Sequence, residues 1–592
     1  MENPERVTLF AQTDARNKRT PFGIKAKDRS RHMYVIGKTG MGKSTLLENM
    51  AVQDIKNGEG IVFIDPHGST AEKLLEYVPE ERINDVLYLA PFDMEYPISF
   101  NIMEDVGADR RHLVVSGLMS TFEKIWVDAW SARMAYILQN TLLALLEYPD
   151  ATLLGVNKMY TDKGFRKKVV DNITDPSVRA FWVEEYAAYT DRYTQEATPA
   201  IQNKIGQFAS NPLIRNIIGQ PKSSFDMRKL MDEQKIVIVN LSKGRVGEGN
   251  ANLLGSMFIT KVYLAAMSRA DASSQEIVRL PNSYLYVDEF QSFANKSFAD
   301  ILSEARKYKL NLTIAHQYIE QMEEEVRAAV FGNVGTMITF RVGAYDAEIL
   351  EKEFAPTFTA QDLVNLGFAQ IYLKLMIDGV SSQPFSATTL PPIEPPRISH
   401  RDQIVAASRK QFGKPRLEVE EIITQNLAPV TPPPGTKTGP RESARENGRE
   451  SGREDTQKIE RKPEGGGQRR SGIELREKEK NSSERKNFQP EKKESVPRKK
   501  DTTELSSLVR KMEKGKKEDD DLSKNAKDDL KNALASIISA SKDASQEKEK
   551  ERKEEAQPQN QKSKENPQRE EEKTKKEIPE NELKKILEVP EE

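Results

Sequence analysis

One stretch near the start of the chain has the spacing G-x-x-x-x-G-K-[ST], from Gly37 to Ser44. Glycines at this spacing let backbone N–H groups curl around phosphates, and a helix N-terminus behind them adds positive partial charge. The Lys43 ammonium group can then reach the β and γ phosphates, and the Ser44 hydroxyl can bind Mg²⁺. We therefore expect ATP and Mg²⁺ as cofactors, bound through Gly37, Lys38, Thr39, Gly40, Met41, Gly42, Lys43, Ser44 and Thr45.

The residues on either side of this loop have the pattern that it needs. Met33–Ile36 is an apolar run that predicts a buried strand. A helix is expected from about Lys43 to Lys56, because apolar residues recur there at helical spacing: Leu46, Leu47, Met50 and Ala51. A strand, a glycine-bearing loop and a helix in this order are the context that supports a phosphate-binding role.

A second candidate site follows the apolar run Ser283–Val287, which ends in the adjacent acids Asp288 and Glu289. A strand delivers its last side chains into the crevice where a nucleotide lies. We expect Asp288 to hold Mg²⁺ through water and Glu289 to polarise the attacking water as general base. The alternative is a surface strand end with two solvated acids. Together with a phosphate loop, the pair predicts hydrolysis rather than binding alone.

Two further polar residues are candidates for the same chemistry. Gln317 follows the predicted strand Leu310–His316. It either senses the γ-phosphate and positions water or merely caps the strand. Arg306, in a basic helix end, is either an arginine finger acting across a subunit boundary or a solvated surface arginine.

Two loops leave alternatives open. Asp65 begins the turn Asp65-Pro66 after the predicted strand Gly60–Ile64. It lies near the site or only opens a turn. The loop from Ser242 to Gly249 carries glycines and basic residues, which fit either contact with a phosphate chain or a simple flexible connection.

Apolar strands and helical patterns alternate along two parts of the chain, which predicts an α/β fold with a mainly parallel sheet. Between them, residues 104–234 show long helical patterns, with one apolar stripe made by Trp130, Met134, Ile137, Leu138 and Leu142. We expect an all-α insertion there. The predicted organisation is a polar, basic lead-in (1–30), an ATPase domain (31–103 and 235–397), the insertion (104–234), a linker (398–427) and a tail (428–592).

Composition excludes several functions. The 592 residues include no cysteine, so disulfides, thiolate metal sites and cysteine nucleophiles are absent. The 90 Lys and Arg nearly balance the 92 Asp and Glu, so net charge does not decide for or against nucleic acid. No signal peptide and no run of about 18 apolar residues is found. We expect a cytoplasmic location, either free or peripheral at the inner face of the cell membrane through a partner.

The predicted tail, 428–592, is rich in Lys, Glu, Arg, Ser and Gln and is expected to be disordered, because it cannot bury enough apolar surface. Three short amphipathic pieces interrupt it, around Leu505–Met512, Leu530–Ile538 and Leu583–Leu587. They fit either helices that fold on a partner or transient helices without one.

Taken together, the motifs resemble those of the type IV secretion coupling proteins, the motor ATPases of conjugative DNA transfer. These belong to the FtsK/HerA-like group of RecA-fold DNA translocases. The resemblance covers about residues 20–390 and rests on Gly37–Ser44, Asp65-Pro66-His67-Gly68, Ser99-Phe100-Asn101, Tyr286–Phe290 and Ala315-His316-Gln317.

The resemblance implies a role for each candidate residue. Lys43 and Ser44 bind ATP–Mg²⁺, Asp288 the metal and Glu289 the water. Gln317 is the sensor, Arg306 the trans-acting arginine, and Arg31 a nucleotide-site arginine just upstream of the phosphate loop. The family further implies a RecA-like fold, a hexameric ring, and DNA held mainly at its phosphates in a central channel. The insertion corresponds to an all-α domain that engages DNA-processing partners such as a relaxase and secretion-channel proteins.

One departure leaves the cargo open. Many coupling proteins begin with membrane-spanning helices, and this sequence shows none. Either a separate protein is the membrane anchor, or the chain is a soluble relative. The alternatives are therefore a cytosolic HerA-like DNA translocase in repair or segregation and, in another class, an ATP-gated docking protein that recruits cargo.

Overall fold

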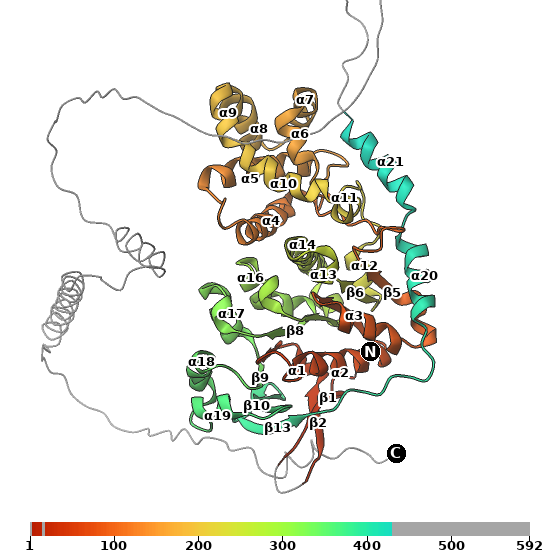
Figure 1. Cartoon of the computed structure of the whole chain (residues 1–592), viewed down its shortest axis with the longest axis vertical. Coiled ribbons are helices and arrows are strands. Elements are labelled where there is room, and N and C mark those ends of the chain that lie inside the picture. Colours follow the sequence, from red (N-terminus) through yellow and green to blue (C-terminus); the bar gives the residue numbers. More distant parts are fainter. Residues whose placement is uncertain (1–2, 15–17, 429–592) are drawn as a thin grey trace, which may run out of the picture. The chain divides into compact units, whose positions relative to one another are not determined.

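The structure, a computed structural model, describes residues 3–14 and 18–428 (Figure 1). The tail predicted over 428–592 and its three amphipathic pieces lie outside the described residues, apart from Ala428.

Within the described residues an eleven-stranded sheet forms the centre of the fold, in the order β2-β1-β13-β10-β9-β3-β8-β7-β4-β6-β5. From β9 to β5 the neighbouring strands are parallel. These strands are β9 (Thr336–Thr339), β3 (Met33–Ile36), β8 (Leu310–His316), β7 (Ser283–Val287), β4 (Gly60–Asp65), β6 (Ile236–Asn240) and β5 (Val86–Leu89). The predicted α/β class with a mainly parallel sheet is confirmed.

The other end of the sheet is antiparallel. It consists of β10 (Gln370–Lys374), β13 (Phe385–Thr389), β1 (Val7–Gln12) and β2 (Pro21–Lys25), and a small hairpin is made by β11 (Met376–Ile377) and β12 (Val380–Ser381). The expected lead-in, 1–30, is therefore wrong in part, because it supplies two strands and α1 (Ala26–Arg29). Phe10 is fully buried. β1 joins the rest of the sheet through β13, which lies far away in the sequence, so a local pattern could not reveal that pairing.

Helices cover both faces of the sheet, as buried parallel strands require. Alternate residues of one strand enter different cores: Met33 and Val35 pack with α2 (Lys43–Lys56), whereas Tyr34 and Ile36 face the opposite side. The other helices of the ATPase part are α3 (Ser69–Leu74), α13 (Lys243–Val246), α14 (Glu248–Met267), α16 (Ser297–Glu304), α17 (Glu324–Asn333), α18 (Ala344–Phe354), α19 (Ala360–Asn365) and the exposed α15 (Ser274–Arg279).

Residues 104–234 consist of helices and the loops that join them, and most gather in one group beyond α14 in Figure 1. Four residues of the predicted stripe, Met134, Ile137, Leu138 and Leu142, are buried, and Trp130 is half-buried. The helices are α4 (Arg111–Ile125), α5 (Ala132–Glu147), α6 (Gly155–Thr161), α7 (Lys163–Asn172), α8 (Pro176–Ala180), α9 (Asp191–Ala197), α10 (Pro199–Ser210), α11 (Pro212–Ile218) and α12 (Met227–Asp232). Among the helices of the described residues, none has the length and apolar character to cross a bilayer.

The stretch expected to be a linker, 398–427, instead forms α20 (Arg401–Phe412) and α21 (Arg416–Leu427). Ile404 on α20 and Ile423 on α21 are buried. The Arg409 guanidinium pairs with Asp93 at 2.7 Å. The few apolar residues of this polar stretch recur at helical spacing, so each helix packs along one narrow side, α20 on β5 and α21 on α11.

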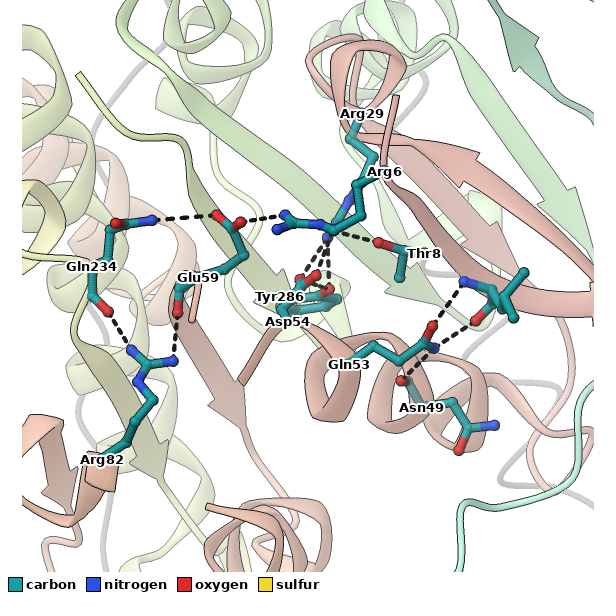
Figure 2. A network of polar contacts seen from close by, with 11 residues as sticks. Arg6, Thr8, Arg29, Asn49, Gln53, Asp54, Glu59, Arg82, Gln234 and Tyr286 are labelled. Carbon is teal, nitrogen blue, oxygen red and sulfur yellow. Dashed lines mark hydrogen bonds and ion pairs between the residues drawn. The ribbon is translucent and has the colours of Figure 1, made fainter. Parts of the chain in front are cut away.

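A buried polar network ties the N-terminal residues to the phosphate-loop helix (Figure 2). Arg29 on α1 donates to both carboxylate oxygens of Asp54 on α2, at 2.7 and 2.9 Å. The Tyr286 hydroxyl on β7 accepts from Arg29 at 2.7 Å and donates to Asp54 at 2.5 Å. Arg29 also stacks on Tyr284, 3.7 Å from the ring centroid. Removing one partner of such a buried pair typically costs about 3–5 kcal/mol.

Candidate nucleotide-binding site

The phosphate loop lies between β3 and α2 and needs its glycines for physical reasons. Gly40 and Gly42 have φ of 76° and 114°, in the region that side chains disfavour. At Gly37 a Cβ would lie 2.5 Å from the Phe340 Cβ, so a larger residue does not fit. Lys43 donates to the carbonyl oxygens of Gly37 at 2.7 Å and Lys38 at 3.2 Å, which folds its ammonium group over the loop.

The two separate stretches singled out in the sequence meet at the start of α2. The Ser44 hydroxyl donates to the Asp288 carboxylate at 2.7 Å. Burial raises the pKa of Asp288, and the bond from Ser44 opposes this shift. A hydroxyl and a carboxylate side by side at a phosphate loop are the hard oxygen ligands that Mg²⁺ prefers, so these residues fit the ion.

Glu289 is held at the turn after β7, where its φ of 49° lies in the left-handed region. Its carboxylate accepts hydrogen bonds from the side chains of Gln317 and Gln291, and the His67 Nε2 lies 3.8 Å away. Burial alone would raise the pKa of Glu289, but the contact with His67 and the hydrogen bonds from Gln317 and Gln291 lower it to about 2. The side chain is therefore an ionised carboxylate at neutral pH.

Gln317 joins the phosphate loop to this carboxylate. Its amide nitrogen donates to Glu289, and its amide oxygen accepts from the Thr39 hydroxyl at 3.0 Å. Gln317 thus bridges the phosphate loop and the Glu289 carboxylate.

His67 was not among the predicted site residues, although its motif Asp65-Pro66-His67-Gly68 was noted. The contact with the Glu289 carboxylate raises the pKa of His67. Asp65 accepts from the backbone N–H groups of His67 at 2.8 Å and Ala71 at 2.9 Å, so it shapes the turn that presents the histidine. The motif follows β4, and β4 lies beside β7, which carries Asp288 and Glu289 at its end. This strand order places His67 at the site, and the motif alone does not reveal it.

Arg31 and Arg306 are not brought to the phosphate loop of their own chain. Arg31 precedes β3, whereas the loop follows that four-residue strand, a separation of about 13 Å along it. Arg306 lies in a short turn of helix, Ala305–Tyr308, just before β8, and is exposed. Both are at the amino edge of the parallel strands. Burial lowers the pKa of His32 to about 4, and the charge of Arg306 adds to that shift, so Arg306 lies near the residue that follows Arg31.

The loop after Glu289 contacts the helical stretch. Lys124 on α4 donates to the backbone oxygens of Gln291, at 2.6 Å, and Ala294. Burial lowers the pKa of this lysine to about 8. The loop expected at 242–249 contains the short helix α13, whose Lys243 donates to the Ser292 hydroxyl at 2.8 Å.

Residues 14–262 match the family described as "Helicase HerA, central domain". The matched range holds the phosphate loop, His67 and the helical stretch, and it ends before β7. No curated protein matches the chain. The fold and the site define a P-loop ATPase. The family match confirms the resemblance to the HerA-like ATPases that the motifs indicated.

Solved structures give distant likenesses. The unbound conjugative coupling protein TrwBdeltaN70 is 14% identical, with 63% of this chain and 87% of that chain covered and a TM-score of 0.47. TrwB in complex with ADP and Mg²⁺ is 15% identical, with 64% and 89% covered and a TM-score of 0.45. VirB4 of Thermoanaerobacter pseudethanolicus is 12% identical, with 66% and 98% covered and a TM-score of 0.45.

Proposed function

We propose that the protein is an ATP-hydrolysing DNA translocase, and that it serves as the coupling-protein ATPase of a type IV secretion or conjugation-like system. The observation that carries the proposal is the convergence of Ser44, Asp288 and Glu289 at one phosphate loop. The match to the HerA central domain supports DNA as the partner. The type of system rests on the motif resemblance alone.

In this proposal each residue has a defined role. Lys43 leaves its loop carbonyls and pairs with the phosphates, while Ser44 and Asp288 hold Mg²⁺. The ion, when bound, neutralises charge on the β- and γ-phosphate oxygens. Glu289 accepts a hydrogen bond from the attacking water. Because its pKa is about 2, it orients the water more than it abstracts a proton in the ground state. Gln317 reports the γ-phosphate to Glu289.

The placement of Arg31 and Arg306 supports action in trans. Neither reaches its own phosphate loop, and Arg306 is exposed at the amino edge of the sheet. In a closed ring of head-to-tail contacts, this edge would face the nucleotide of the neighbouring subunit. We propose such a ring, a hexamer by family resemblance, with Arg306 as the arginine finger.

Mixing two inactive variants tests this arrangement. Lys43→Ala and Arg306→Ala proteins, each inactive alone, should regain about a quarter of the wild-type turnover when mixed in equal amounts. The reason is that about one site in four then combines an intact loop with an intact neighbouring arginine. ATP turnover after exchange of subunits is the measurement.

The control for this experiment is Lys307→Ala, which removes the exposed cation beside Arg306 and should leave turnover unchanged. An inactive mixture, or full activity of Arg306→Ala alone, contradicts the trans role.

DNA dependence tests the motor function itself. Wild-type turnover should rise on addition of DNA, because phosphate contacts would couple DNA to the cycle, and the Glu289→Gln variant should show no such rise. The DNA concentration for half-maximal stimulation should increase by a factor on the order of a thousand between about 50 and about 200 mM salt, as for about six phosphate contacts or more.

Two other outcomes of that assay favour the alternatives. If DNA leaves the rate unchanged and Glu289→Gln changes nothing, the ATP-gated docking protein replaces the motor. If DNA stimulates the rate, neighbouring genes separate the remaining two candidates: relaxase and secretion-channel genes indicate a coupling protein, and a nuclease gene indicates a HerA-like translocase of the cytosol.

The remaining parts have proposed roles as well. The helical stretch, 104–234, would engage DNA-processing partners such as a relaxase or channel proteins. A separate membrane anchor would hold the protein at the inner face of the cell membrane. Lys124 supports the first role, since it joins the helical stretch to the loop after Glu289.

A further inference from the structure

Phe368 is a large apolar side chain that the fold leaves exposed. It is 74% exposed, in the turn between α19 and β10. The turn has a fixed form, because the Gly367 N–H donates to the side chain of Gln370 at 2.8 Å. Ala369 has a φ of 60° there. Single exposed apolar residues are common and need no explanation by themselves. Phe368 is of interest because of its position in the fold.

Hydrogen bonds tie the segments on both sides of this turn to residues that neighbour the phosphate loop. On one side, Lys38 of the loop donates to the Arg341 carbonyl at 2.8 Å, and the next residue, Val342, donates to Leu363 of α19 at 3.4 Å. On the other side, the Thr389 N–H donates to the Ala369 carbonyl at 2.9 Å.

The second connection also reaches the phosphate loop. The Thr389 hydroxyl oxygen lies 3.8 Å from the place that a Cβ would take on Gly42. The segments before and after Phe368, at Leu363 and Ala369, are thus linked to residues beside the phosphate loop.

The direction in which a nucleotide lies across the loop follows from the acids. Asp288 and Glu289 follow β7, and Gln317 follows β8. The γ-phosphate must lie on this side of the loop, because these residues act on it. In the sheet order β13-β10-β9-β3-β8-β7, the opposite side of the loop carries β9, β10 and β13. The nucleoside end therefore points toward the strands that hold Phe368.

We propose that Phe368 is the platform on which the base of the bound nucleotide stacks. The ligand group is a flat heteroaromatic base, and the aromatic ring offers its face without selecting the base by hydrogen bonds. The inference rests on the proposed function, since it requires a nucleotide at this loop. It adds an affinity-determining residue from the antiparallel part of the sheet.

The test compares a nucleotide with a ligand that has phosphates and no base. Calorimetric titration of the full chain with ADP should show a dissociation constant about tenfold to a hundredfold higher for Phe368→Ala than for wild type. Titration with pyrophosphate should give the same dissociation constant for both proteins within about twofold, because the phosphate contacts are untouched. The KM for ATP should rise while kcat stays within about twofold.

Two further variants complete the test. Phe368→Tyr keeps an aromatic ring and should bind ADP like wild type. Leu417→Ala removes another exposed apolar side chain, 80% exposed, and should leave the ADP dissociation constant unchanged. Equal ADP affinity of Phe368→Ala and wild type overturns the inference. If the oligomer mass of the variant is also altered, the Phe368 side chain belongs to a contact between subunits.

Loss of pyrophosphate binding in Phe368→Ala also overturns the inference, because the loop itself would then be disturbed. If wild type binds neither ADP nor ATP, the proposed function fails first, and the inference fails with it.

Discussion

Replacing Lys43 by alanine should lower ATP turnover about a thousandfold, with the fold retained. The ammonium group is the cation nearest the expected phosphates, and removing one such preorganised group costs on the order of a hundredfold to a thousandfold in rate. Its hydrogen bonds go to carbonyls of the loop, and the Glu289 carboxylate that its charge also stabilises keeps its hydrogen bonds from Gln317 and Gln291. Phosphate release and circular dichroism, measured on the same preparation, check both statements.

Lys56→Ala is the matched control for this variant, because Lys56 ends the same helix far from the loop. Its turnover should equal that of wild type. Unchanged turnover in the Lys43 variant would show that the phosphate loop is not the site of hydrolysis.

Replacing Glu289 by glutamine should separate binding from hydrolysis. ATP affinity should stay within a few-fold of wild type, because Lys43, Ser44 and the loop amides are untouched. Turnover should fall about a hundredfold to a thousandfold, because the negative charge that orients the attacking water is lost. Equilibrium binding of ATP and single-turnover hydrolysis together measure the two effects.

Glu325 is an exposed acid on α17, so Glu325→Gln is the control. It should bind and hydrolyse ATP like wild type. A Glu289→Gln protein that turns over normally would reassign the acid to a structural role.

The titration of Glu289 gives an independent check. Its folded pKa of about 2 lies below the ordinary 4.5, so the stability it contributes is fully present above pH 4.5 and is lost as pH falls toward 2. The variant should lack this part of the acid transition.

The central parallel strands and the proximity of Ser44 to Asp288 could both be predicted from the sequence. Continuous apolar runs such as Met33–Ile36 and Ser283–Val287 mark buried parallel strands, and parallel strands bring their carboxyl ends to one edge. Gln317 could be placed for the same reason. The roles of these residues in catalysis stay predictions.

Contacts between distant segments could not be read from the chain. Arg31 is near the phosphate loop in sequence, but a strand lies between them and takes them to opposite edges of the sheet. His67 needed the strand order, which puts β4 beside β7. The helices of 401–427 were missed because their apolar residues are few, and only their packing on α11 and β5 shows that they belong to the fold.

The Arg29–Asp54 pair bears on where this protein can be cut. A version that starts at residue 31, where the phosphate-loop strand is about to begin, would leave the Asp54 carboxylate and the Tyr286 hydroxyl inside the protein without their cation. The cost of about 3–5 kcal/mol is a large share of the roughly 5–15 kcal/mol that holds a typical domain together. The smallest version expected to fold therefore keeps β1, β2 and α1. The fold of the ATPase starts at β1 and not at the strand that precedes the phosphate loop.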